Sequence, residues 1–142
     1  MTIDEFNELE PMAQHAILEK CCGAQQWIKQ MIARAPFSSL EHLIYFADYN
    51  WDNSHEESWM EAFTSHSKIE GSTSQLNTEE IQQYEKKFGY PFIVAEKEMT
   101  EKEMGILIQE RLSNSEEEEL FVAMQEQQKI TKIKLGELFR EE

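Results

Sequence analysis

The sequence predicts an all-α fold: a single-domain bundle of about seven or eight helices spanning residues 1–142, with one short buried extended segment at 90–95. Apolar residues recur three and four positions apart along most of the chain, which is the spacing of one helix face. Five segments begin with Ser or Thr followed three residues later by Glu, the pattern of a helix capping box. Only residues 90–95 favour an extended backbone, and one such segment cannot form a sheet by itself.

The first half of the chain carries start, period and stop signals for successive helices. Capping boxes are expected for the pairs Thr2 and Glu5, Ser38 and Glu41, and Ser54 and Glu57. Pro11 suits a first helical turn, Gly23 suits a helix end, and Pro36 stops the helix before it. The apolar positions at helical spacing are Trp27, Ile28, Met31, Ile32 and Ala35, then Leu40, Leu43, Ile44 and Ala47.

The second half repeats these signals after one interruption. A helix containing Tyr84 ends at Gly89, and Pro91 then disfavours helical backbone at Tyr90. Phe, Ile and Val in the next positions prefer extended surroundings, so residues 90–95 are expected to be a buried connection. Two more capping boxes are expected for Thr100 with Glu103 and Ser115 with Glu118. Positions expected to face inward are Ile81, Tyr84, Phe88, Met104, Leu107, Ile108, Arg111, Leu120, Ala123, Met124, Ile130, Ile133 and Leu138.

The charge is strongly acidic, with a formal net charge of −15. Nucleic-acid backbones and anionic lipid surfaces would repel such a surface, so we expect neither as a partner. The four glutamates at residues 116–119 are interpreted as a solvated helix start, where carboxylates suit the positive end of the helix dipole.

The cysteines and the termini favour a cytoplasmic protein. Cys21 and Cys22 are adjacent, and neighbours in sequence rarely form an unstrained disulfide, so two thiols in a reducing compartment are expected. No apolar stretch is long enough to cross a bilayer, and the first residues lack the pattern of a signal peptide.

Most common catalytic motifs are missing. None of the four histidines pairs with another at i+4, and neither cysteine lies near a histidine, so no metal is expected. Nor does the sequence contain a glycine-rich nucleotide loop or a nucleophilic-serine elbow.

His66 is the candidate that remains. It shares one helix face with Trp59, Ala62 and Phe63, at the open end of an apolar stripe. Its imidazole suits acid–base chemistry near neutral pH. The alternative is a hydrogen-bonded core histidine, which is the commoner role for a His on an apolar face.

Several motifs in order along the chain resemble one family, the OHCU decarboxylases, which act on 2-oxo-4-hydroxy-4-carboxy-5-ureidoimidazoline. The run from Trp59 to Gly71 is similar to the family's Trp-Leu-x-Ala-Phe…His-Pro-Lys-Ile-Gly-Asp segment. The other similar motifs are Cys22-Gly23 with Trp27 and Met31, Arg34-Ala35-Pro36-Phe37, Tyr84…Lys87-Phe88-Gly89-Tyr90, Phe92-Ile93-Val94, Arg111-Leu112-x-Asn114, and Glu126-Gln127-x-Lys129-Ile130-Thr131-Lys132.

The resemblance implies an all-helical, cofactor-free decarboxylase of uric acid degradation that releases CO2 and yields (S)-allantoin, commonly as a homodimer. It implies that His66 handles the proton and that backbone N–H groups of Phe92, Ile93 and Val94 anchor substrate oxygens. Lys97 stands where the family usually has an Arg and would neutralise the substrate carboxylate, and Ser67 follows the His within the substrate-binding set.

The chain departs from the family pattern at three places. Ser67 replaces a Pro, Ile69-Glu70-Gly71 replaces Ile-Gly-Asp, and residues 72–83 are too short to hold the family's Glu-Gln pair. Gln75, Glu79 and Glu80 are the nearest residues of the right type to replace that pair.

Two hypotheses besides an active decarboxylase therefore stay open. The chain could be a catalytically degenerate family member that binds a small molecule or a protein. It could also be a helical interaction module whose acidic face meets basic partners.

Overall fold

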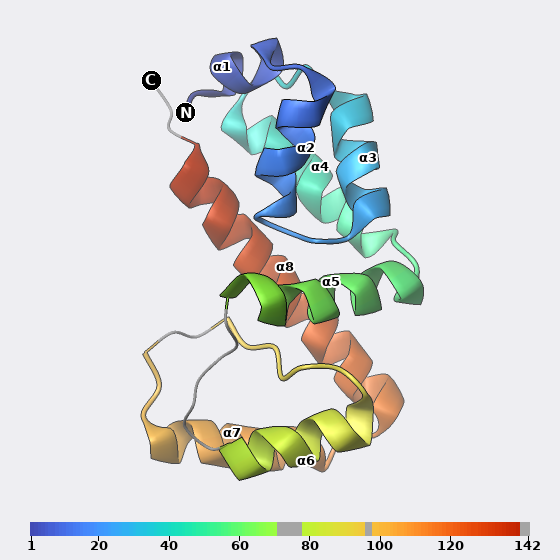
Figure 1. The fold of residues 1–142 in the computed structure, drawn as a ribbon, viewed down its shortest axis with the longest axis vertical. Helices are drawn as coiled ribbons and strands as arrows, with labels where there is room; N and C mark the ends of the chain where they lie inside the picture. Colours follow the sequence, from blue (N-terminus) through green and yellow to red (C-terminus); the bar gives the residue numbers. More distant parts are fainter. Residues whose placement is uncertain (71–77, 96–97, 140–142) are drawn as a thin grey trace.

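The computed structural model describes residues 1–70, 78–95 and 98–139, with the side chains of residues 66–70 and 78 excepted. This part of the chain contains eight helices and no strand, which confirms the all-α prediction (Figure 1). The helices are α1 (Ile3–Glu8), α2 (Pro11–Glu19), α3 (Gln25–Arg34), α4 (Leu40–Asp52), α5 (Glu56–Glu70), α6 (Thr78–Phe88), α7 (Glu101–Leu112) and α8 (Glu116–Leu138).

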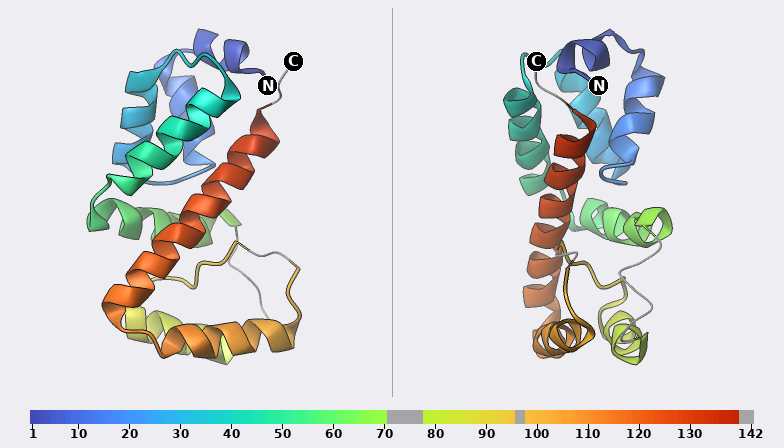
Figure 2. Two further views of the ribbon diagram at one scale, coloured as in Figure 1. Left: turned by 180° about the vertical axis from the view of Figure 1, so that it is seen from behind. Right: turned by 90° about the vertical axis from the view of Figure 1, so that its left-hand side faces the viewer.

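The long helix α8 organises the molecule. Helices α1 to α4 gather beside its C-terminal half, α5 crosses it near the middle, and α6 and α7 lie side by side at its N-terminal end (Figures 1 and 2). The two ends of the described chain meet, since the rings of Phe6 and Phe139 lie 5.4 Å apart edge to face. Residues 90–95 run without helix between α5 and the α6–α7 pair, as predicted.

Three of the five predicted capping boxes are confirmed, at Thr2, Thr100 and Ser115. The Ser38 box is wrong by one residue, because Ser39 is the N-cap of α4 and accepts a hydrogen bond from the His42 amide. The Ser54 box is also wrong: α5 begins at Glu56, and the Ser54 hydroxyl donates to the Asn50 carbonyl at 2.7 Å.

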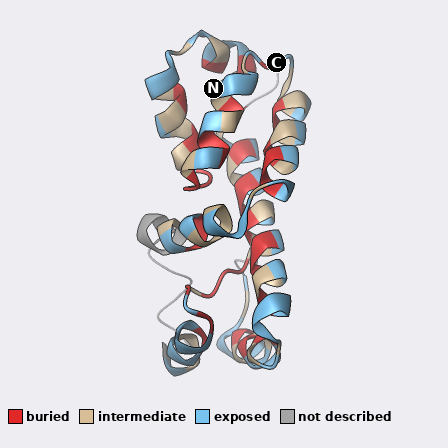
Figure 3. Ribbon diagram, turned by 90° about the vertical axis from the view of Figure 1, so that its right-hand side faces the viewer, coloured by how far each residue is buried: buried red, intermediate tan, exposed pale blue. Residues whose placement is uncertain are grey.

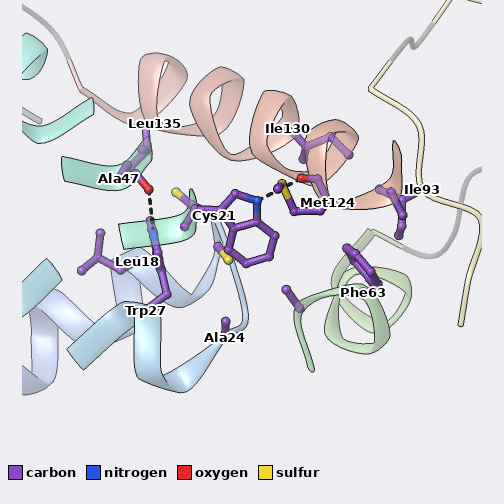
Figure 4. Close-up of a cluster of buried hydrophobic side chains, with 14 of the residues drawn as sticks. Leu18, Cys21, Ala24, Trp27, Ala47, Phe63, Ile93, Met124, Ile130 and Leu135 are labelled. Carbon is purple, nitrogen blue, oxygen red and sulfur yellow. Dashed lines mark hydrogen bonds between the residues drawn. The ribbon is translucent and has the colours of Figure 1, made fainter. Parts of the chain in front are cut away.

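The core around α2, α3, α4 and α8 is mainly apolar, and the indole N–H groups within it are paired. The indole N–H of Trp27 donates to the Ala47 carbonyl at 3.0 Å (Figure 4). The indole of Trp51 donates to the Met124 carbonyl at 2.9 Å and so ties α4 to α8. Both indoles are nearly inaccessible to water, and each brings large apolar area without leaving an unpaired donor.

The inward face of α8 differs from the predicted one. Ile133 is 43% exposed and Leu120 and Leu138 are half-buried, whereas Glu119 is fully buried. The buried positions of α8 follow one stripe at helical spacing (Figure 3). Ile133 lies off that stripe by its position in the sequence. That stripe consists of Glu119, Ala123, Met124, Gln127, Ile130, Thr131 and Leu135.

Candidate active site

Helix α5, which carries His66, is packed against a glycine at the end of the α2–α3 connection. A Cβ atom added to Gly23 would lie 2.4 Å from the Cβ of Ser65, closer than two carbons can approach. Gly23 therefore lets α5 lie directly on this connection at the residue before His66. The prediction of Gly23 as a helix end is wrong, because α2 ends at Glu19 with Lys20 as its C-cap. The close approach of Ser65 is what requires a glycine at this position.

Two polar contacts fix α5 along the rest of its length. Glu61 accepts a hydrogen bond from the Gln25 amide at 2.8 Å, so a carboxylate of α5 satisfies the N-terminus of α3. The Trp59 indole donates to the Trp51 carbonyl at 3.1 Å at the end of α4. These contacts fix the orientation of α5 and so the position of its last turns.

An aromatic contact joins α5 to the extended segment. Phe63, one turn before His66, is fully buried, and its ring centroid lies 5.0 Å from that of Tyr90. In Figure 4 the side chains of Phe63 and Ile93 lie beside each other between α5 and the extended segment. The backbone of α5 near His66 and the segment Phe92-Ile93-Val94 thus belong to one neighbourhood.

A buried charged network, the Arg111 network, lies on the other side of the segment. Its members are Arg111 of α7, Glu119 and Tyr84, with Asn114 and the carbonyl of Ile93 as further partners. Arg111 donates from Nε to Oε2 of Glu119 at 2.7 Å and from Nη1 to the Ile93 carbonyl at 2.5 Å. Its Nη2 lies 2.6 Å from the same Glu119 oxygen as an ion pair. The hydroxyl of Tyr84 donates to Glu119 at 2.5 Å, and the Asn114 amide donates at 3.0 Å.

The protonation of this network follows from its burial. Arg111 is 4% exposed and Glu119 is 0% exposed, so each charge depends on the other for compensation. Burial raises the pKa of Tyr84 well above its usual range, which keeps the phenol protonated as a donor to Glu119.

Glu126 of α8 holds the end of the extended segment at Ala95. The Ala95 amide donates to Glu126 at 3.1 Å, and Lys129 donates to the same carboxylate at 2.6 Å. Burial acts to raise the pKa of Glu126, but the hydrogen bonds from Lys129 and Ala95 outweigh it and leave the pKa below its usual range. The carbonyl of Ile93 and the amide of Ala95 are therefore both fixed, one on each side of Val94.

The backbone N–H groups of Ile93 and Val94 differ from that of Ala95. Ile93 is 0% and Val94 6% exposed, yet neither backbone N–H makes a hydrogen bond to any residue among 1–70, 78–95 and 98–139. Buried N–H groups are nearly always paired, so two neighbouring ones without a partner in the described part of the chain are unusual. Phe92, the third residue of the set, is 1% exposed, with its ring 4.4 Å below the Arg111 guanidinium.

The other predicted site residues are distributed as follows. Glu79 is exposed, and Glu80 is half-buried with one carboxylate oxygen that has no partner within the described part of the chain. Glu80 lines an open groove of about 840 Å³ together with α7 residues such as Gly105 and Ile106. His66 lies in α5, but its side chain, that of Ser67, and residues Gln75 and Lys97 lie outside the described residues.

The pairing of Arg111 with Glu119 was not predicted from the sequence. One signal was present: Arg111 occupies a position on the apolar stripe of α7, where a charged residue indicates a buried pair. Nothing local distinguishes Glu119 from the three glutamates before it, and all four were interpreted as solvated. That interpretation is wrong for Glu119, whose position on the buried stripe of α8 turns it toward Arg111.

The comparisons with known proteins agree with this fold. The family model for OHCU decarboxylase matches residues 7–83 and 75–136, and the chain belongs to this family. A crystal structure of OHCU decarboxylase in the presence of (S)-allantoin superposes with a TM-score of 0.76 at 33% identity, covering 85% of this chain and 95% of that one. A crystal structure of (S)-allantoin synthase has a TM-score of 0.74 at 15% identity, covering 98% and 54%, and shows the same fold.

Two curated relatives are proteins of uric acid degradation. The bifunctional protein TTL of Arabidopsis thaliana is 30% identical over 146 residues, which is 84% of this chain and 45% of the relative. The bifunctional protein of Bacillus sp. (strain TB-90) is 40% identical over 60 residues, 42% of this chain and 12% of the relative. The chain thus spans less than half the length of these relatives.

The alignments also bear on the short connection at residues 72–83. The family model matches in two stretches that overlap at 75–83. The plant alignment runs over 146 positions although it includes only 84% of the 142 residues here, so the relative has residues that this chain lacks.

The described part of the chain contains neither a candidate metal site nor a candidate membrane span. No group of three or more His, Cys, Asp or Glu side chains there could hold a metal ion. No helix within it is long and apolar enough to cross a membrane.

Proposed function

We propose that this protein catalyses the cofactor-independent decarboxylation of OHCU to (S)-allantoin in uric acid degradation. The observation that carries the proposal is the pair of buried amides at Ile93 and Val94, which have no partner among the described residues and lie in the same neighbourhood as the helix that bears His66. Family membership and the likeness to an OHCU decarboxylase crystal structure support it.

The chemistry demands what this neighbourhood offers. When the carboxylate leaves as CO2, the electrons of the broken C–C bond stay on a ring carbon and spread into the adjacent imine or carbonyl. Amides aimed at that oxygen or nitrogen stabilise the developing negative charge. A proton must then reach the carbon on one face to give a single enantiomer, and we assign that step to His66, whose imidazole suits proton transfer near neutral pH.

Two further residues complete the proposed substrate site. Lys97 neutralises the substrate carboxylate as a point charge, without the two-pronged grip of an arginine. Ser67 lies next to His66 at the substrate. Gln75, Glu79 and Glu80 are proposed as replacements for the family's Glu-Gln pair, which orients the histidine.

The proposal is tested with freshly made OHCU and purified protein. Spontaneous decay has no chiral environment and gives racemic allantoin, so the accumulation of optically active allantoin reports catalysis alone. We expect a clear excess of the S enantiomer with the wild-type protein and with His55→Ala, a matched histidine substitution at the exposed start of α5. We expect its loss with His66→Ala. Equal rates for the wild type and His66→Ala would overturn the proposal.

A second candidate function is ligand binding without turnover, by a catalytically degenerate member of the family. The short connection at residues 72–83 and the gapped alignment favour it. Calorimetry with (S)-allantoin separates the two: heat of binding without formation of optically active product indicates the degenerate member, and turnover excludes it.

The remaining expectations stand as proposals with the decarboxylase. We propose one domain over residues 1–142, a homodimer and a cytoplasmic location. The family resemblance supports the dimer and the single domain, and the two buried free thiols support a reducing compartment.

A further inference from the structure

We propose that Arg111 is a positioning residue that orients and polarises the Val94 amide from behind, with Glu119 as its counter-charge. This inference rests on the proposed function, because it concerns an amide assigned to the substrate. It goes beyond that function by giving a task to a buried ion pair that touches no substrate.

The geometry of one peptide unit sets the direction of the Val94 N–H. The carbonyl of Ile93 and the N–H of Val94 belong to the same planar peptide, and the only cis bond in the described chain is Ala35–Pro36. In a trans peptide the C=O and the N–H point in opposite directions. Arg111 holds the Ile93 oxygen at 2.5 Å, so the Val94 N–H points away from Arg111.

The peptide between Ile93 and Val94 is held on both sides. Arg111 contacts the segment twice, through the Ile93 carbonyl and through the face of the Phe92 ring at 4.4 Å. Its planar guanidinium is held in turn by a hydrogen bond from Nε to Glu119 and by the ion pair with the same carboxylate. The Ala95 amide is fixed to Glu126 on the other side of Val94. The peptide between Ile93 and Val94 therefore has little freedom to rotate.

The positive charge of Arg111 also polarises the peptide between Ile93 and Val94. A cation that hydrogen-bonds a carbonyl oxygen draws electron density through the peptide and makes the opposite N–H a stronger donor. The effect is large here because both charges are shielded from water. Charge that develops on the substrate as CO2 leaves gains more from such a donor than the ground state does.

Glu119 balances the buried charge of Arg111. An isolated guanidinium would be too costly to bury, and Glu119 compensates it. Donors from Tyr84 and Asn114 occupy the remaining capacity of that carboxylate. Lysine would not serve at position 111, since it lacks the fork that reaches Glu119 and the Ile93 carbonyl at once.

The test compares Arg111→Lys with Arg34→Lys, a matched substitution of an arginine that lies over the Phe46 ring at 4.3 Å, on the α3–α4 side. The amide resonance of Val94 in 15N-labelled protein is the first readout. We expect Arg111→Lys to move the Val94 amide proton upfield, toward a weaker donor, and Arg34→Lys to leave it in place.

The second readout is kinetic. We expect Arg111→Lys to lower kcat for OHCU about 10- to 100-fold with a smaller change in KM, because a donor that matters most in the transition state has been weakened. Arg34→Lys should retain wild-type values. A merely structural role would reduce the amount of folded protein and leave kcat per folded molecule unchanged.

Tyr84→Phe provides the test if Arg111→Lys does not fold. Without the phenol donor, Glu119 draws the guanidinium more strongly, so the Val94 proton should move the same way by less. An unmoved Val94 resonance in either folded variant overturns the proposal, even if kcat falls. A wild-type protein without turnover overturns the proposed function instead, and the Val94 resonance still decides the role of Arg111.

Discussion

The two ends of helix α8 are stabilised in different ways. Its middle and its C-terminal half pack with α1 to α4 in an apolar core, in which buried indoles pair with main-chain carbonyls. Its N-terminal part packs with α6 and α7 around a buried ion pair, Arg111 with Glu119. An apolar core needs only shape and volume, and its side chains can be exchanged for others of similar size. A charged network fixes particular atoms, which is what a segment presenting backbone amides requires.

The largest expected loss of stability comes from the apolar end. Trp51→Ala removes a fully buried indole and leaves the Met124 carbonyl without this donor. We expect the free energy of unfolding to fall by about 3–5 kcal/mol, measured by urea denaturation. Trp51→Phe should lose clearly less. Equal losses for the two would contradict the view that this end depends on buried volume.

The ion pair should respond in a way that no apolar contact does. Arg111→Met leaves Glu119 buried without its cation, and we expect a loss of about 3–5 kcal/mol in unfolding free energy. Combining it with Glu119→Leu removes both charges and should recover most of that stability. Turnover of OHCU should stay low in the double variant, because the Ile93 carbonyl is no longer held. Recovery of both stability and turnover would show that the pair serves packing alone.

A smaller effect is expected where α5 lies on Gly23. Gly23→Ala places a methyl group 2.4 Å from the Ser65 Cβ, and we expect a loss of about 1–3 kcal/mol together with reduced turnover as α5 shifts. Ser65→Gly in the same chain removes the clashing atoms and should restore stability. Thermal unfolding and OHCU turnover of Gly23→Ala and of the double variant check this. If Gly23→Ala were as stable as the wild type, α5 would not contact Gly23 as described.

The smallest expected effect is a pH dependence at Glu126. Its pKa is lowered in the folded protein, so its contribution to stability is present above the usual carboxyl pKa and is lost as the pH falls through the folded value. Glu126→Gln should therefore be less stable than the wild type at neutral pH, and the difference should shrink in acid. Urea midpoints across this pH range provide the measurement, and a difference that grows in acid would contradict it.

Sequence alone predicted the helices well because their signals are local. The caps at Thr2, Thr100 and Ser115 and the break at Gly89 depend on residues a few positions apart. The errors at Ser38 and Ser54 are choices between neighbouring positions, which local pattern resolves poorly.

The site was predictable only in part, because its pairings are set by tertiary packing. The extended segment was expected from Pro91 and its apolar residues, and the assignment of its amides came from family resemblance. The Arg111–Glu119 pair joins two helices, and Glu119 stands in a run of four identical residues. Only the packing of α8 determines which of the four turns inward.

The most direct test of the central claim follows the amides of 15N-labelled protein during titration with (S)-allantoin. If the segment keeps its Ile93 and Val94 amides for a ligand, these two resonances shift most. The Ala95 amide, already bonded to Glu126, should shift less. Saturable shifts at Gly105 and Ile106, in the groove beside Glu80, with Ile93 and Val94 unmoved, would place the ligand elsewhere and contradict the account.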